Sequence, residues 1–361
     1  MYLLRLDIAS EPGEDIDGHQ KLLKETFEFE ETDHSGPPSP DGAHQKATGL
    51  TIITAGLFIV GEIAGAGTVA LPAAMSKASY AGFIIMILVV GMSLYCGLLL
   101  GWSWQVVKEQ RKTTEPIKDP FPAIGEAATG IWGRHAVSIC LNVQIFLTVV
   151  VYLLLSSEII SSFISFHIGD LHSSANLRIW LLILSLVVLP FTWLGTPKDF
   201  WFIALAAAAT TACAVLLIII KYTLIAPKDL STVEKAPVTF LSMASAFGTF
   251  VFAFTGASLF PTVQSDMKKP DQFAKAIVVG YIATCFLYVP TAAGGFAVLG
   301  KDIEDSILET LSNYDKVHHL NRLIVSIVEI LFALHFICGL VLMINPFAQQ
   351  MEGFFNVPHS K

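Results

Sequence analysis

The sequence predicts an all-α membrane protein with about eight transmembrane helices, and three observations support this prediction. Of the 361 residues, 53% are hydrophobic and only 14% are charged, whereas a soluble domain carries about 25% charged residues. The apolar residues form long continuous runs rather than the short alternating segments of a membrane β-barrel. The net charge of −8 disfavours a polyanionic partner. A soluble enzyme, a disordered chain and a nucleic-acid-binding protein are therefore poor fits.

Charge divides the chain into an acidic head and a nearly neutral body. Residues 1–49 contain eleven Asp or Glu and four Lys or Arg, and the following 312 residues contain nineteen acidic and eighteen basic residues. The segment 34–41, HSGPPSPD, has the Pro- and Ser-rich composition of a flexible linker. We therefore predict a disordered, acidic cytosolic tail over residues 1–48, a membrane domain over 49–352 and a short C-terminal tail over 353–361.

Eight apolar runs are long enough to be membrane spans, since a helix needs about 20 mostly apolar residues to cross a bilayer. Six of these runs lack charged residues, the first contains Glu62 and the eighth contains Glu329. The runs cover residues 50–75, 78–107, 135–157, 179–197, 200–220, 236–265, 276–300 and 323–349.

The placement of basic residues predicts the orientation of these spans. Cytoplasmic segments of membrane proteins carry an excess of Lys and Arg. With the N-terminus inside, the inner segments contain fourteen Lys or Arg and the outer loops contain eight. We therefore expect a multi-pass protein with a cytoplasmic N-terminus, in the plasma membrane or in a lysosomal or vacuolar membrane.

The first and sixth predicted spans share an interruption. In each, a glycine lies five residues before a proline: Gly67 and Pro72 in GEIAGAGTVALP, and Gly256 and Pro261 in FAFTGASLFP. Glycine permits unusual backbone angles and proline removes a hydrogen-bond donor. Both helices should therefore unwind at membrane depth, where unpaired backbone is tolerated only if it lines a cavity or is buried in protein.

Two matched breaks predict a binding site for a small zwitterion, because freed N–H and C=O groups and half-helix dipoles can hold its charged ends. Each break also opens a set of helices, which is the pattern of an inverted repeat. Two phenylalanines of the sixth span could close over a bound side chain. The predicted binding residues are Ala64, Gly65, Ala66, Gly67, Thr68, Phe252, Phe254, Thr255, Gly256 and Ser258.

These breaks resemble signatures of a known family. The run GAGTVALPAAMSKASYAG at 65–82 resembles the first-helix signature of the amino acid/auxin permease family. The run FGTFVFAFTGASLFPTVQSDMKKPDQFAKA at 247–276 is similar to its sixth-helix signature, in which PTVQSDMKKP is the most specific element. NPFAQQME at 345–352 resembles the end of its eighth helix. The resemblance covers roughly residues 47–352.

The resemblance implies alternating-access transport of amino acids, commonly with a cotransported proton or sodium ion, on a fold of two inverted five-helix repeats. Family members usually have eleven spans, so the eight predicted here imply a C-terminally shortened chain. Two alternatives remain open: a non-transporting regulatory chain made from a shortened permease, and a receptor- or channel-like bundle with continuous helices. The substrate class, the lipid bilayer and a coupling ion are the implied partners, and no cofactor is expected.

Two ionisable residues at membrane depth are candidates for ion or proton coupling. Glu62 lies just before the first break, where a charged acid costs about 2.5–3.5 kcal/mol on insertion scales and normally faces the bundle interior. Such surroundings favour its neutral, protonated form. His335 lies near the middle of the eighth span, which the implied fold places beside the first. We therefore hypothesise a proton relay between Glu62 and His335, the alternative for each being a structural hydrogen-bonded role.

Polar residues of the third span recur at steps of four: Gln144, Thr148, Tyr152 and Ser156. This spacing places them on one helix face. The first three are candidates for lining a substrate path, although helix–helix hydrogen bonding explains the stripe equally well. The sequence contains neither a phosphate-binding G-x-x-x-x-G-K-[ST] motif nor the metal-binding H-E-x-x-H motif. We therefore predict neither an enzyme nor an ATP-driven pump.

Overall fold

The computed structural model describes residues 49–111, 119–168, 173–190, 201–318 and 322–354, and within these ranges the chain is helical with no β-strand. The predicted tail at 1–48, and most of the predicted tail at 353–361, lie outside the described residues. The α-helices are α2 (Ile52–Ile63), α3 (Ala66–Ala78), α4 (Ala81–Arg111), α5 (Pro120–Thr129), α6 (Ile131–Ile168), α7 (Ser173–Val188), α8 (Trp201–Ile225), α9 (Phe240–Ala253), α10 (Phe260–Asp266), α11 (Phe273–Val298), α12 (Ile307–His318) and α13 (Leu323–Phe354). Short 3₁₀ turns are η3 (Leu230–Thr232), η4 (Ala257–Leu259), η5 (Pro270–Gln272) and η6 (Gly300–Asp302).

The predicted all-α membrane fold is confirmed. In the described chain, six helical spans are long and apolar enough to cross a membrane, and the bent pair of α2 and α3 makes a seventh. The span predicted at 179–197 coincides with α7, whose apolar part is shorter, and residues 191–197 lie outside the described residues. The chain is therefore an integral, multi-pass membrane protein, with up to seven spans by this measure where the sequence predicted about eight.

Some helices expose apolar faces of the kind that a membrane-embedded protein presents to lipid. On α4, Ile84, Ile87 and Leu88 are each at least 60% exposed. The whole second half of α2 is buried instead, including Glu62. A helix with apolar residues all round is buried in protein or in lipid, and burial in this structure separates the two cases: α2 is central and α4 is peripheral.

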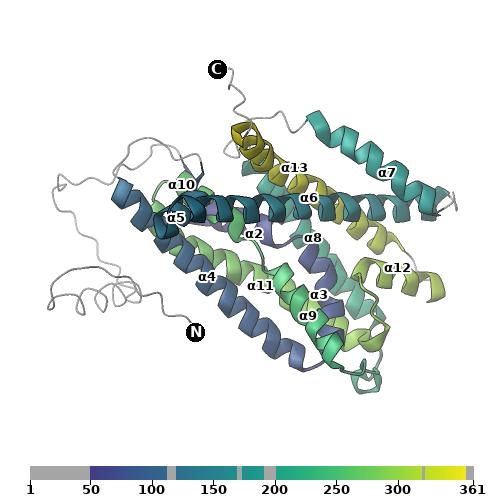
Figure 1. The fold of residues 1–361 in the computed structure, drawn as a ribbon. Helices are drawn as coiled ribbons and strands as arrows, with labels where there is room; N and C mark the ends of the chain where they lie inside the picture. The colour runs from purple at the N-terminus through teal and green to yellow at the C-terminus, as the bar shows by residue number, and fades with distance from the viewer. Residues whose placement is uncertain (1–48, 112–118, 169–172, 191–200, 319–321, 355–361) are drawn as a thin grey trace, which may run out of the picture. The chain divides into compact units, whose positions relative to one another are not determined.

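The broken helices pack at the centre of the bundle (Figure 1). Helix α11 contacts both α2 and α3, α3 also contacts α9, and α2 contacts α8. Helix α13 packs along α6 and α8. The central helices therefore bring both breaks together, and α6, α8 and α13 flank them.

Backbone hydrogen bonds also tie the start of the first broken span to the end of the second. Leu50 donates its N–H to Asp266 O at 2.9 Å and accepts from Lys268 N at 2.9 Å. This isolated parallel bridge between Leu50 and Met267 joins residues more than 200 positions apart. The bridge links Leu50, just before the start of α2, to Met267, just after the end of α10. The two broken spans are therefore connected at their far ends as well as at the breaks.

Candidate functional site

The first break separates α2 from α3 and turns the chain by 60°. Ala64 ends α2 with φ −78° and ψ 53°, and Gly65 follows with φ −106° and ψ −119°. The Gly65 N–H donates to Ile63 O at 2.8 Å, and the Thr68 N–H donates to Gly65 O at 3.0 Å. The first span is interrupted as predicted, but at Ala64 and Gly65; Gly67 and Pro72, which predicted the interruption, both lie inside α3.

The second break separates α9 from α10. Helix α9 ends at Ala253, Phe254 has φ −98° and ψ 12°, and Gly256 has φ −161° and ψ 6°. The chain makes the short turn η4 and resumes as α10 at Phe260, with Pro261 in its first turn. Proline is tolerated there because that N–H has no helical partner. The predicted interruption of the sixth span is also confirmed.

The two breaks lie against each other, and Tyr288 of α11 joins them. Its hydroxyl oxygen is 2.6 Å from Ile63 O and 3.0 Å from Ala253 O, which are the carbonyls of the last residues of α2 and α9. Terminal helix carbonyls have no partner within their own helix. The one hydroxyl hydrogen is donated to one of these carbonyls or shared between them, so a single buried hydroxyl links both helix ends. Sequence reasoning missed this residue, although a tyrosine amid an apolar span signals a hydroxyl that needs a partner.

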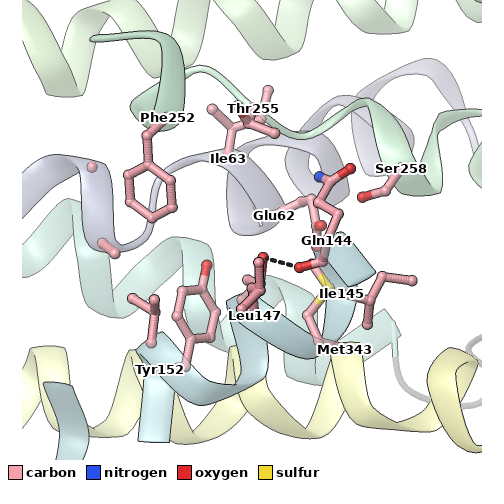
Figure 2. A pocket seen from close by; sticks show the side chains of 14 residues that line it. Glu62, Ile63, Gln144, Ile145, Leu147, Tyr152, Phe252, Thr255, Ser258 and Met343 are labelled. Atoms are coloured by element: carbon pink, nitrogen blue, oxygen red, sulfur yellow. Dashed lines mark hydrogen bonds between the residues drawn. The ribbon is translucent and has the colours of Figure 1, made fainter. Parts of the chain in front are cut away.

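A cavity of about 290 Å³ opens beside the breaks (Figure 2). This volume is near the lower end of small-molecule sites. Phe252, Thr255 and Ser258 approach it from the second break, and Tyr152 approaches it from α6. The lining residues are Glu62, Ile63, Ala66, Gly67, Gln144, Ile145, Leu147, Thr148, Val151, Tyr152, Phe252, Thr255, Ser258 and Met343.

The structure divides the predicted binding residues into two groups. Those that line the cavity are Ala66, Gly67, Phe252, Thr255 and Ser258. The others are behind its wall: Ala64, Gly65, Thr68, Phe254 and Gly256 do not line it. Phe254 is 1% exposed and its ring packs edge-on against Tyr288 with centroids 5.1 Å apart. Phe252 is therefore the aromatic residue of this pair that can contact a ligand, and Phe254 belongs to the packing around the break.

Three residues of the polar stripe on α6 line the cavity. Gln144, Thr148 and Tyr152 all line it. Ser156 is fully buried further along the helix, where its hydroxyl donates to Tyr152 O at 2.7 Å. The stripe thus contributes three polar side chains opposite the two breaks.

Glu62 and His335 are both buried but occupy different surroundings. Glu62 lines the cavity, and none of the fourteen described residues that line it is Lys, Arg or His. His335 does not line the cavity. Its Nδ1 lies 2.9 Å from Ala207 O and 2.8 Å from the Thr211 hydroxyl oxygen, both on α8. No hydrogen bond joins Glu62 to His335 among the described contacts, so the two are neighbours of the same break rather than a bonded pair.

The chemistry available in the cavity is that of binding and proton exchange. One carboxyl group, one phenol, hydroxyls and an amide surround it, with apolar walls between them. Within the described ranges, no three His, Cys, Asp or Glu residues are grouped so that they could hold a metal ion. The N-terminal end of α3 borders the cavity at Ala66 and Gly67, and such an end favours an anionic group.

Comparisons with known proteins agree with this architecture. The family model described as transmembrane amino acid transporter protein matches residues 48–359. The amino acid transporter AVT1B of Arabidopsis thaliana is 26% identical over 68% of this chain and 44% of its own length. AVT1D of the same plant is 26% identical over 67% and 43%, and lysine histidine transporter-like 4 is 27% identical over 70% and 57%.

The chain thus spans about half the length of the curated relatives it matches. The family model covers nearly the whole described body, including both breaks, the cavity and α13. The chain belongs to the transmembrane amino acid transporter family.

Proposed function

We propose that this chain carries amino acids across a membrane by alternating access, coupled to a proton or sodium ion gradient, with the proton favoured. The cavity between two broken helices is the observation that carries the proposal. Broken helices at membrane depth expose backbone groups only where these line a cavity or are buried. Membership of the amino acid transporter family supports the same substrate class.

The cavity can recognise the common part of an amino acid. The substrate carboxylate would lie at the N-terminal end of α3, beside Ala66 and Gly67, where N–H groups and the helix dipole favour an anion. Its ammonium group would approach Glu62 and the oxygens of Thr255 and Ser258. These residues lie around one cavity, so both charged ends can be held at once.

The side chain of the substrate would face the apolar walls and the α6 stripe. Phe252, Ile145 and Met343 provide the apolar contacts, and Gln144 and Thr148 provide the polar ones. Since no basic residue lines the described cavity, an acidic side chain would lack a counter-charge there. We therefore expect neutral or basic amino acids to be preferred over acidic ones.

Glu62 would couple transport to protons by binding one in the cavity before the helices rearrange. A carboxyl group without a basic partner in apolar surroundings gains from being neutral or from pairing with a cationic ligand. The excess of basic residues in the inner segments supports a cytoplasmic N-terminus, in a plasma, lysosomal or vacuolar membrane.

The test is uptake by purified chain in reconstituted vesicles, using a panel of acidic, neutral and basic amino acids with and without pH and sodium gradients. We expect accumulation of a neutral or basic amino acid that a pH gradient drives. The Glu62→Gln variant should lose the pH dependence of uptake, whereas Glu158→Gln, at an exposed position of α6, should keep it.

Two outcomes would contradict the proposal. Absence of uptake of every amino acid under both gradients would favour a non-transporting, regulatory chain. Rapid ion flux that needs no gradient of amino acid or proton would favour the channel-like bundle. That alternative predicts continuous helices, in contrast to the two breaks. Unchanged pH dependence in Glu62→Gln would remove this carboxyl from coupling.

A further inference from the structure

The hydrogen bonds of His335 fix which ring nitrogen carries the proton. Nδ1 lies 2.9 Å from Ala207 O, and a carbonyl oxygen only accepts hydrogen bonds, so Nδ1 must be the donor. In the neutral ring, Nε2 is then a bare acceptor. His335 is completely buried, and Nε2 has no partner among the described hydrogen bonds. A buried acceptor without a donor costs free energy, which makes this nitrogen a candidate proton site.

Thr211 connects the Nδ1 side of the same ring to the first break. Its hydroxyl oxygen lies 2.8 Å from His335 Nδ1 and 3.0 Å from Ala64 O. Since Nδ1 donates, the hydroxyl oxygen accepts and its hydrogen is free to reach Ala64 O. These contacts link His335 through Thr211 to the carbonyl of Ala64, the residue that follows α2.

Nε2 and the Tyr152 hydroxyl converge on Gly65. A Cβ atom placed on Gly65 would lie 3.0 Å from His335 Nε2 and 2.5 Å from the Tyr152 hydroxyl oxygen. Glycine at this position leaves room for both polar atoms at one face of the break. Tyr152 also lines the cavity that contains Glu62, whereas His335 does not. Tyr152 is thus a cavity-lining residue (Figure 2) whose hydroxyl lies at the same side of Gly65 as Nε2 of the buried ring.

Few other titratable groups surround this ring. Helices α6, α8 and α12 pack against α13. Tyr152 faces the ring from α6, and Glu62 lies across the break on α2. The buried charges of α8, α12 and α13 are engaged in the ion pairs Lys221–Asp315 and Arg322–Glu329. A proton on Nε2 would thus be governed by Tyr152, Thr211 and the state of Glu62.

We propose that Tyr152 relays a proton from Glu62 to His335 and that Thr211 is the positioning residue that keeps His335 ready to accept it. This inference rests on the proposed function and deepens its coupling step. The Glu62 carboxyl releases its proton to the Tyr152 oxygen, directly or through cavity water, while the Tyr152 hydroxyl proton moves to Nε2. Glu62 becomes a carboxylate, Tyr152 is unchanged and His335 becomes an imidazolium with both nitrogens protonated.

The first test compares variants in reconstituted vesicles. The measured quantity is the ratio of proton-driven accumulation to substrate exchange at equal pH, because exchange needs binding and alternation but no net proton movement. Tyr152→Phe and Thr211→Val should lower this ratio by roughly 100-fold or more, the lower end of typical contributions from a positioned proton-transfer group. Thr211→Ser, which keeps the hydroxyl, should restore it.

Thr284→Val is the matched control for loss of a buried hydroxyl. Thr284 is also fully buried, and its hydroxyl donates only within its own helix, to Gly280 O at 2.9 Å. This variant should keep the ratio of the unmodified chain. Unmodified ratios in both Tyr152→Phe and Thr211→Val would overturn the relay.

A second test needs no transport and therefore separates the relay from the proposed function. Deuterium exchange at the imidazole C2 carbon of His335, followed against pH by peptide mass spectrometry, reports its protonation. Tyr152→Phe and Thr211→Val should displace the profile to lower pH, since each removed oxygen would stabilise the charged ring. The exchange profiles of Thr211→Ser and Thr284→Val should superimpose on the profile of the unmodified chain. A His335 profile that never titrates, or one that neither variant moves, would overturn the relay even if transport is observed.

Discussion

Ile63 occupies the space that a side chain on Gly256 would need. Ile63 is the last residue of α2, and Gly256 lies in the break after α9. A Cβ atom on Gly256 would overlap the Ile63 side chain. The two breaks therefore touch through an isoleucine and a glycine, and the absence of a side chain at 256 permits their close approach.

This contact predicts that Gly256→Ala destabilises the bundle and impairs transport. Overpacking a tight site typically costs about 1–3 kcal/mol, and here the strain falls directly between the breaks. Thermal unfolding in detergent and vesicle uptake would measure the two effects. Gly248→Ala is the matched control, because a Cβ atom on Gly248 of α9 meets nothing within 4 Å. Equal behaviour of the two variants would contradict the proposed contact.

Tyr288→Phe should destabilise the chain while preserving its aromatic packing. The variant keeps the ring that packs against Phe254 but removes the hydroxyl that contacts Ala253 O and Ile63 O, of which Ile63 O still accepts from the Gly65 N–H. A buried acceptor deprived of its partner costs about 1–3 kcal/mol. We expect a lower unfolding temperature and reduced uptake, compared with Tyr95→Phe at a position 60% exposed on α4. A Tyr288→Phe variant as stable and active as Tyr95→Phe would show that the hydroxyl does not hold the breaks.

A buried ion pair fastens α12 to α8. Lys221 Nζ lies 2.6 Å from an Asp315 carboxylate oxygen, and both side chains are at most 4% exposed. Removing one partner of such a pair costs about 3–5 kcal/mol because the other charge remains buried, whereas replacing both by apolar residues is often neutral.

We therefore expect Lys221→Met and Asp315→Leu each to lower the unfolding temperature strongly, and the double variant to recover most of the loss. The four unfolding curves form a double-mutant cycle. Additive effects in that cycle would mean that the two side chains do not interact.

The carboxyl group of Glu126 should contribute to folding stability in a way that changes with pH in the acid range. Hydrogen bonds from Arg111 and then Arg134, at 2.8 and 2.9 Å, hold the pKa of this α5 carboxyl below its ordinary value of 4.5. A lowered folded-state pKa contributes stability above the ordinary value, and this contribution is lost as the pH falls toward the lowered one.

Glu126→Gln should therefore flatten the fall of unfolding temperature on the acid side and leave less stability at neutral pH. The comparison is with Glu109→Gln at an exposed position of α4. An acid-side slope in Glu126→Gln as steep as in the unmodified chain would contradict the prediction.

Much of the architecture could be predicted from local sequence patterns. The Gly- and Pro-containing runs pointed to both breaks, but the first break lies at Ala64 and Gly65, whereas Gly67 and Pro72 are inside helix α3. The step of four on α6 placed Gln144, Thr148 and Tyr152 on the face that lines the cavity. The length of apolar runs predicted the spans, although the run at 179–197 corresponds to a helix too short to count as one in the described chain.

Contacts between distant segments were not predictable in the same way. The hypothesis of a Glu62–His335 relay named two residues near the first break but did not reveal that Tyr152 and the His335 ring approach the same glycine or that Thr211 contacts the ring. Phe254 and Phe252 looked equivalent in sequence, yet one packs on Tyr288 and the other lines the cavity. Within each span, periodicity says which residues share a face but not what that face meets.

The sequence alone determined that the chain is an all-α membrane protein with two opened helices, because apolar run length and backbone chemistry are local properties. Only the tertiary structure decided that Tyr288 joins the breaks, that Thr211 contacts the His335 ring and that Glu62 lines a cavity where none of the described lining residues is basic. Those facts depend on how residues up to 225 positions apart meet when the helices pack, and in an apolar environment many helix pairings bury similar surface. The few polar partners then distinguish the pairing that forms.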